Sequence, residues 1–203
     1  MYALVINNEI TKYFNHPKGF TLGDLQYPKD IFTKWSVEEK EAIGIYEVVF
    51  DNSNFKDEKW YINTNQTFAF ANDTVTASYG TAFPKAHADS NAVDADGNNI
   101  LDEDGNQVIN YGLKTNLIQT LKSQVAGILN DTDWYITRKT EKSTAIPSAI
   151  STHRDAVRTK QATMETAITN ASDTPALETL YTYTEQSDGT ATKPLGELPV
   201  LES

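Results

Sequence analysis

The chain has 203 residues, of which 39% are hydrophobic, and its formal net charge is −11. It contains no cysteine, which excludes disulfides, a thiol nucleophile and a thiolate metal site. No apolar run reaches membrane-spanning length and no basic-then-apolar leader is visible, so we expect a protein made in a reducing cytoplasm without a membrane partner.

The negative charge is unevenly distributed along the chain. The net charge is −3 in residues 1–85, −6 in residues 86–112, +3 in residues 113–172 and −5 in residues 173–203. A nucleic-acid-binding protein usually carries a basic stripe on a neutral or basic whole. Here one mildly basic segment lies between acidic ones, so we expect no nucleic-acid partner.

Residues 1–85 predict a small β-rich domain. The opening stretch "MYALVINNEITKYF" alternates apolar and polar residues around Asn7-Asn8, which is typical of a β-hairpin. Further strand-like runs, separated by Asn and Asp turns, occupy residues 59–62, 67–71 and 74–79.

One short helix is predicted inside this domain. Ser36 is followed three residues later by Glu39, which is the spacing of a capping box, and Gly44 is a natural helix stop. We therefore expect a helix over residues 37–43 and a strand over residues 45–50.

Residues 86–112 hold two copies of an eight-residue unit, "DADGNNIL" from Asp94 and "DEDGNQVI" from Asp102. A calcium loop of the EF-hand type needs Gly at position 6 and Glu at position 12. Counted from either aspartate, position 6 is an amide residue and position 12 is not acidic, so both frames fail. The Asp-Gly pairs instead predict tight turns in an acidic β-hairpin or flexible linker. An adventitious cation site is the alternative.

Residues 113–172 predict a helical hairpin. Apolar residues recur every three or four positions from Leu113 to Leu129, which indicates an amphipathic helix ending near Asn130. The stretch "DTDWYIT" then interrupts the pattern, and Pro147 suits the first turn of a second amphipathic helix. Two such helices pack on each other or on further copies of the chain, so we expect a homo-oligomer.

The C-terminal residues 173–203 have a short apolar patch and end in "TKPLGELPVLES". Its Pro and Gly residues disfavour regular structure, so an extended C-terminal arm is predicted. The whole chain is thus expected to be an α+β protein with four parts: domain, acidic hairpin or linker, helical hairpin and arm.

The sequence contains no motif for catalysis or for a cofactor. The three histidines, His16, His87 and His153, are far apart and none lies in a zinc-binding context. Asp131 and Asp133 do not share a helix face, and they favour helix capping over acid-base chemistry. No nucleophile elbow or glycine-rich phosphate loop occurs, so we expect a non-enzymatic protein without a metal or cofactor.

Aromatic and basic side chains gather around the interruption between the two helices. Trp134 and Tyr135 could stack on a sugar or base, but such a pair beside amphipathic helices more often wedges between them. The nearby basic side chains could pair with the acidic linker or with a partner, or simply form a solvated helix face; they are Arg138, Lys139, Arg154 and Arg158.

Residues 113–180 resemble a module of tailed-bacteriophage proteins that are usually encoded beside tail-fibre genes. The module runs as a helix, Leu-Leu-x-x-Thr-Asp-Trp, a short polar turn, Pro, and a helix carrying Tyr/His-Arg-x-Ala-Val/Ile-Arg. This chain matches it at Ile128-Leu129, Thr132-Asp133-Trp134, Arg138, Glu141, Ile146-Pro147 and His153-Arg154-Asp155-Ala156-Val157-Arg158. The stretches "MYALVINNEITKYF" and "YPKDIFTKWSVEEKEAIGIYEVV" also look like the beginning of such proteins, so the resemblance touches about two-thirds of the chain.

The chain departs from the family pattern at two places. Lys142-Ser143 stands where the family has a turn containing Gly, and His153 replaces the more usual Tyr.

The resemblance implies a non-enzymatic tail structural protein of the virion, made in the host cytoplasm and docked on other tail or fibre proteins of the fibres or baseplate. In that reading Trp134 anchors the helical module, Asp133 caps it, and Arg154 and Arg158 make ionic contacts. With Arg138, these are the candidate partner-binding residues. A tail-fibre assembly chaperone that leaves before maturation is the alternative. A weaker alternative is a host-glycan-binding tail protein that uses its exposed Tyr and Trp side chains.

Overall fold

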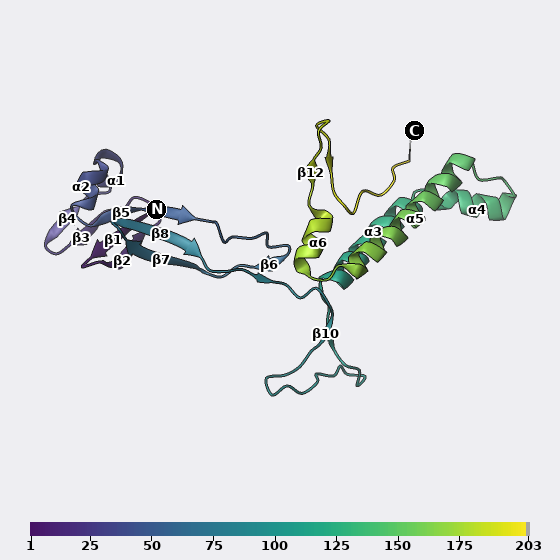
Figure 1. The fold of residues 1–203 in the computed structure, drawn as a ribbon, viewed down its shortest axis with the longest axis horizontal. Coiled ribbons are helices and arrows are strands. Elements are labelled where there is room, and N and C mark those ends of the chain that lie inside the picture. Colours follow the sequence, from purple (N-terminus) through teal and green to yellow (C-terminus); the bar gives the residue numbers. More distant parts are fainter. Residues whose placement is uncertain (202–203) are drawn as a thin grey trace. The chain divides into compact units, whose positions relative to one another are not determined.

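The computed structural model describes residues 1–201 and divides the chain into two compact units, Met1–Phe83 and the part from Pro84 onward. Strands and helices are both present, which confirms the α+β class (Figure 1). The division lies two residues before the predicted end of the first domain.

The N-terminal unit is built on a five-stranded sheet with strand order β2-β1-β5-β8-β7 (Figure 1). Its strands are β1 Tyr2–Ile6, β2 Glu9–Phe14, β5 Ile45–Asp51, β7 Gln66–Ala71 and β8 Thr74–Tyr79. β5 and β8 pair in parallel, whereas the other neighbours are antiparallel. Asn7 and Asn8 have φ values of 53° and 65°, as a tight turn between β1 and β2 requires, and they confirm the predicted hairpin.

The five-stranded sheet curls so that its two edge strands, β2 and β7, come into contact. The rings of Tyr13 on β2 and Phe68 on β7 have centroids 4.7 Å apart. One core cluster consists of small and β-branched side chains of β1, β5 and β8, namely Ala3, Val5, Val48, Val75 and Ala77.

A second core cluster lies on residues of β1, β2 and β5 and on the segment between β2 and β5. It contains Leu4, Phe14, Phe20, Ile31, Phe32 and Ile45. This segment holds the paired strands β3 Phe20–Leu22 and β4 Leu25–Tyr27 and two short helices, α1 Ile31–Lys34 and α2 Val37–Glu41. The prediction of one helix was therefore wrong, because burial of Ile31 and Phe32 supports a single-turn α1 that has no side-chain cap to reveal it.

The capping box of α2 is confirmed. The Ser36 amide donates to Glu39 Oε2 at 2.8 Å, and the Glu39 amide donates to Ser36 Oγ at 3.2 Å. Gly44 has φ +80°, and a Cβ atom there would lie 2.3 Å from the carbonyl oxygen of Val5. The helix therefore ends before a position where β1 passes too close for any larger residue.

A further pair of short strands, β6 Tyr61–Ile62 and β9 Phe83–Pro84, follows in this part of the chain.

The acidic segment forms a stem that carries two lobes. β10 Ser90–Asn91 pairs with β11 Ile109–Asn110 to make the stem, and the lobes, residues 93–99 and 101–107, lie beyond it (Figure 1). Each lobe turns at a glycine with positive φ, 84° at Gly97 and 80° at Gly105. The predicted Asp-Gly turns are confirmed, although they make two lobes rather than one hairpin.

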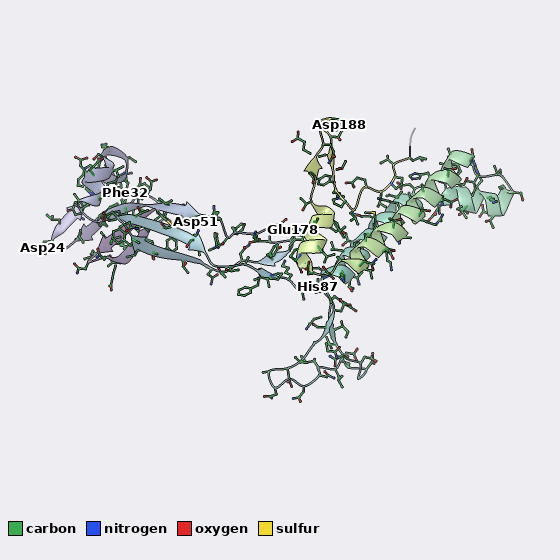
Figure 2. The ribbon with its side chains drawn as sticks, viewed as in Figure 1. Asp24, Phe32, Asp51, His87, Glu178 and Asp188 are labelled. Atoms are coloured by element: carbon green, nitrogen blue, oxygen red, sulfur yellow. The ribbon has the colours of Figure 1, made fainter. Side chains whose placement is uncertain are left out.

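The stem joins the first helix of the C-terminal unit through backbone contacts. The amide of Lys114 donates to the carbonyl of His87, which lies at the base of the stem in Figure 2. Asp89 accepts a hydrogen bond from the Gly112 amide at 2.7 Å and one from Thr115 Oγ1 at 2.8 Å.

Three helices form the middle of the C-terminal unit: α3 Leu113–Asn130, α4 Asp133–Lys142 and α5 Ser148–Asn170. α3 packs on α5, burying Leu121 and Val125 on one helix and Val157, Met164 and Ile168 on the other, as the predicted hairpin requires. The segment between these two helices, where the family pattern has a short polar turn, is mostly helical. Ten of its residues form α4, which has Asp133 in its first turn and Lys139 and Lys142 in its last, charges that favour the helix dipole.

The C-terminal residues were predicted to form an extended arm, and this was wrong for the first part. α6 Thr174–Tyr181 follows Asp173, whose carboxylate accepts from the Ala176 amide at 2.8 Å. β12 Thr184–Glu185 and β13 Ala191–Thr192 then form a small hairpin with Asp188 at its tip (Figure 2). An N-cap and an Asp-Gly turn supplied the local signals for these elements. Residues 193–201 contain no helix or strand.

Among residues 1–201, no helix combines the length and the apolar character needed to cross a membrane.

Candidate interaction site on the helical module

A buried arginine ties the three helices together where α3 ends and α4 begins. Arg154 on α5 is only 6% exposed. Its Nη1 atom donates to the Leu129 carbonyl at 2.7 Å and to Thr132 Oγ1 at 2.6 Å, and its Nη2 atom donates to Asp133 Oδ1 at 2.7 Å. We call these four residues the Arg154 joint.

The joint adds hydrogen bonds at a helix boundary, where several donors converge on the Leu129 carbonyl. The Leu129 carbonyl belongs to the last turn of α3, where carbonyls have no partner within the helix. Thr132 is 5% exposed, and its Oγ1 and its amide donate to that carbonyl at 3.0 and 3.1 Å. Arg154, predicted as a contact to a partner, is thus engaged within the chain.

Asp133 was predicted to cap a helix, but it acts instead as the ionic partner of Arg154. It is the first residue of α4, and the N-cap position is Thr132, which makes no side-chain capping bond. The side chain of Asp133 is 56% exposed while that of Arg154 is 7% exposed, so one half of the ion pair faces water.

Trp134 was predicted to wedge between helices, and this was wrong because it is 51% exposed. Its ring lies 3.8 Å from the ring of Tyr135, centroid to centroid, and the guanidinium carbon of Arg138 lies 4.6 Å from the Trp134 centroid. Since α4 buries none of its residues, this aromatic-cationic cluster stands on the surface of the unit.

The aromatic and basic residues of α4 share one face of the helix. At about 100° per residue, Trp134, Tyr135, Arg138, Lys139 and Lys142 fall within an arc of roughly 140°. We call this arc the α4 face. Its acidic neighbour Glu141 lies about 20° beyond Trp134 at one edge, and Asp133, which binds Arg154, lies roughly on the opposite side. The joint therefore holds α4 to the unit on one side and leaves the α4 face toward solvent.

Arg158, the remaining candidate, lies outside this cluster. Its side chain is 51% exposed, and its Nη1 atom lies 3.5 Å from Asp155 Oδ1 one turn earlier in α5. Such an exposed pair contributes little to stability.

His153 lies on the buried side of α5. A cavity of about 290 Å³ beside it is lined by α3, by the joint and by the C-terminal segment, through Ile128, Asp131, Thr132, Leu198, Pro199, Val200 and Leu201. In residues 1–201 no three His, Asp or Glu side chains gather closely enough to hold a metal ion. The cavity is lined mostly by apolar side chains, and its two ionisable lining residues are Asp131 and His153.

A polar centre in the acidic lobes was missed by sequence reasoning. The amides of Ala92, Ile100 and Val108 donate in a cycle to the carbonyls of Val108, Ala92 and Ile100, at 2.8 to 3.0 Å. Gln107 Nε2 lies 2.8 to 3.2 Å from all three of these carbonyl oxygens. We call these three backbone positions with Gln107 the hub.

A repeat in the sequence could have predicted the hub. Besides the two repeats, a third copy of a four-residue element is present, so that Asn91-Ala-Val-Asp, Asn99-Ile-Leu-Asp and Gln107-Val-Ile-Asn recur every eight residues. Three equivalent segments whose backbones meet at the hub account for this spacing.

Comparison with known proteins identified no relative of this chain: no family model, no curated protein and no solved structure matches it.

Proposed function

We propose that this protein is a non-enzymatic structural component of a bacteriophage tail, associated with the fibres or baseplate and acting by docking on other proteins. The proposal begins from the resemblance of residues 113–180 to a tail-associated module. The fold and the site support it through the part that these residues play in the helical unit.

The observation that carries the proposal is the Arg154 joint. Two parts of the motif that carries the resemblance, Thr132-Asp133 and Arg154, lie 22 and 21 residues apart and meet in one hydrogen-bonded centre. A motif that builds a joint, rather than a reaction centre, is what a structural module requires.

The exposed α4 face supports docking as the mode of action. Aromatic residues and arginine are enriched at protein interfaces, where they supply much of the binding energy. Trp134 and Arg138 are stacked and held on a helix that is fixed to the unit from its other side. This arrangement suits an anchor for a protein partner.

Purified particles of the phage that encodes the chain test the proposal. Quantitative mass spectrometry is expected to find the protein at a fixed ratio to the other tail proteins. Its absence from mature particles, together with capture of unassembled fibre protein in the infected cell, would instead establish the assembly chaperone.

A further inference from the structure

Two exposed surfaces of the C-terminal unit are complementary in charge and in chemistry. The first is the α4 face, which has two aromatic rings and three basic side chains, with the single acid Glu141 at its edge. The second is formed by the two acidic lobes. Within residues 1–201 the two surfaces do not contact each other through any hydrogen bond or ion pair.

The lobes combine acidic and apolar side chains without a single base. Residues 86–112 contain no Lys or Arg. Within the lobes, Asp96, Glu103 and Asp104 are exposed, and so are the apolar side chains Val93 and Leu101, which are 51% and 57% exposed. An exposed apolar group rimmed by charge is typical of a protein-binding surface.

The turn carboxylates keep the lobes charged. Asp94 Oδ1 accepts from the amides of Asn98 and Asp96, and Asp102 Oδ1 accepts from those of Asn106 and Asp104. The pKa of Asp94 is lowered, first by the Asn98 amide, and that of Asp102 is lowered, first by the Asn106 amide. Both carboxylates are therefore ionised at neutral pH.

The lobes are also shaped before any partner arrives. The cyclic hydrogen bonds of the hub and the side chain of Gln107 fix the point where the lobes and the stem meet. A surface ordered in advance loses little conformational entropy on binding.

The two surfaces belong to opposite ends of α3. The stem is attached at the start of this helix through Asp89 and Gly112, and α4 follows its last residue. Eighteen helical residues span about 27 Å. In residues 1–201 no hydrogen bond or ion pair joins the lobes to α4. Trp134, Lys139 and Lys142 are exposed, and Tyr135 and Arg138 are half-buried.

We propose that the acidic lobes of one copy dock on the α4 face of a second copy. The lobe carboxylates pair with Lys139 and Lys142, while Leu101 and its apolar neighbours cover the rings of Trp134 and Tyr135. Because the two surfaces differ, the contact is head-to-tail, and it builds a ring or a filament of subunits. This inference does not depend on the assignment to a phage tail.

Complementation between two variants tests the contact. The lobe variant Asp96→Lys/Glu103→Lys/Asp104→Lys leaves the turn-forming aspartates intact, and the face variant Lys139→Glu/Lys142→Glu leaves the joint intact. In sedimentation velocity the wild-type chain is expected to associate as its concentration rises. Each variant alone is expected to lose at least about tenfold in self-association, because close charge pairs become repulsive.

An equimolar mixture of the two variants is expected to associate again, since one supplies an unchanged lobe surface and the other an unchanged α4 face. The matched control Lys18→Glu/Lys122→Glu reverses two exposed lysines outside both surfaces and is expected to behave as the wild type. Far-ultraviolet circular dichroism checks that every variant is folded. A wild-type chain that stays monomeric at all concentrations, or a mixture that stays apart, overturns the proposal.

Discussion

At the scale of single residues, Arg154 is the side chain on which the helical module depends most. It is buried and donates to three acceptors, two of them in the boundary between α3 and α4. Removal of a buried, hydrogen-bonded charge costs more than the net strength of an exposed ion pair.

We therefore expect Arg154→Ala to lower the free energy of unfolding of the C-terminal unit by about 2–3 kcal/mol. The exposure of Asp133 keeps the loss at the lower end of the range for buried pairs. Arg158→Ala, on the same helix but exposed, is expected to change it by less than about 0.5 kcal/mol. Urea unfolding followed by circular dichroism measures both, and equal effects of the two changes would contradict the structural role of the joint.

Ser143 occupies the position where the family pattern has a glycine turn, and its backbone conformation is one that favours glycine. Its φ is +57°, in the left-handed region that residues with a side chain rarely adopt. Ser143→Gly is expected to stabilise the end of α4 by about 0.5–1 kcal/mol, because relief of the strained conformation exceeds the entropy cost of glycine. Amide hydrogen exchange in α4 measures it. Ala145→Gly, where φ is not positive, is expected to have no such benefit.

At the scale of elements, the two lobes share one design and should share one pH dependence. The pKa values of Asp94 and Asp102 are lowered in the folded chain by backbone amides, those of Asn98 and Asn106 first. A lowered folded pKa stabilises the lobe above the usual aspartate pKa, and this stabilisation is lost as the pH falls through the folded value.

The lobe turns are accordingly expected to hold at neutral pH and to loosen below about pH 4. The amide signals of Gly97 and Gly105, followed by NMR during an acid titration, report the two lobes separately. Asp94→Asn is expected to remove the acid transition from the first lobe alone. Asp96→Asn, whose carboxylate accepts no turn hydrogen bond in residues 1–201, serves as the matched control and is expected to leave the transition in place.

At the scale of the whole molecule, each unit has buried apolar residues of its own. Both clustered cores described above lie within residues 1–83, and α3 packs on α5 within the C-terminal unit. Residues 1–83 expressed alone are therefore expected to unfold cooperatively, with an unfolding temperature within a few degrees of that unit's transition in the full chain. Differential scanning calorimetry compares the two. A fragment that fails to fold would show that the sheet depends on residues after Pro84.

The sequence by itself determined the elements whose signals are local. Examples are the Ser36–Glu39 capping box, the Asn7-Asn8 turn and the periodicity of residues 113–130. Each acts between residues a few positions apart, so it does not depend on how the rest of the chain packs. α4 escaped prediction because it buries no residue and so has no apolar period to detect.

Only the tertiary structure decided what these elements do together. From the sequence, Arg154 was expected to be a surface charge or a partner contact. In the fold it is buried and donates to Leu129, Thr132 and Asp133. Trp134 was expected inside, yet the joint holds α4 from the other side and leaves the ring in solvent. Gln107 contacts three carbonyls only because three segments of the chain meet at the hub. Contacts between residues far apart in the chain depend on how the elements pack, and a single local pattern does not encode them.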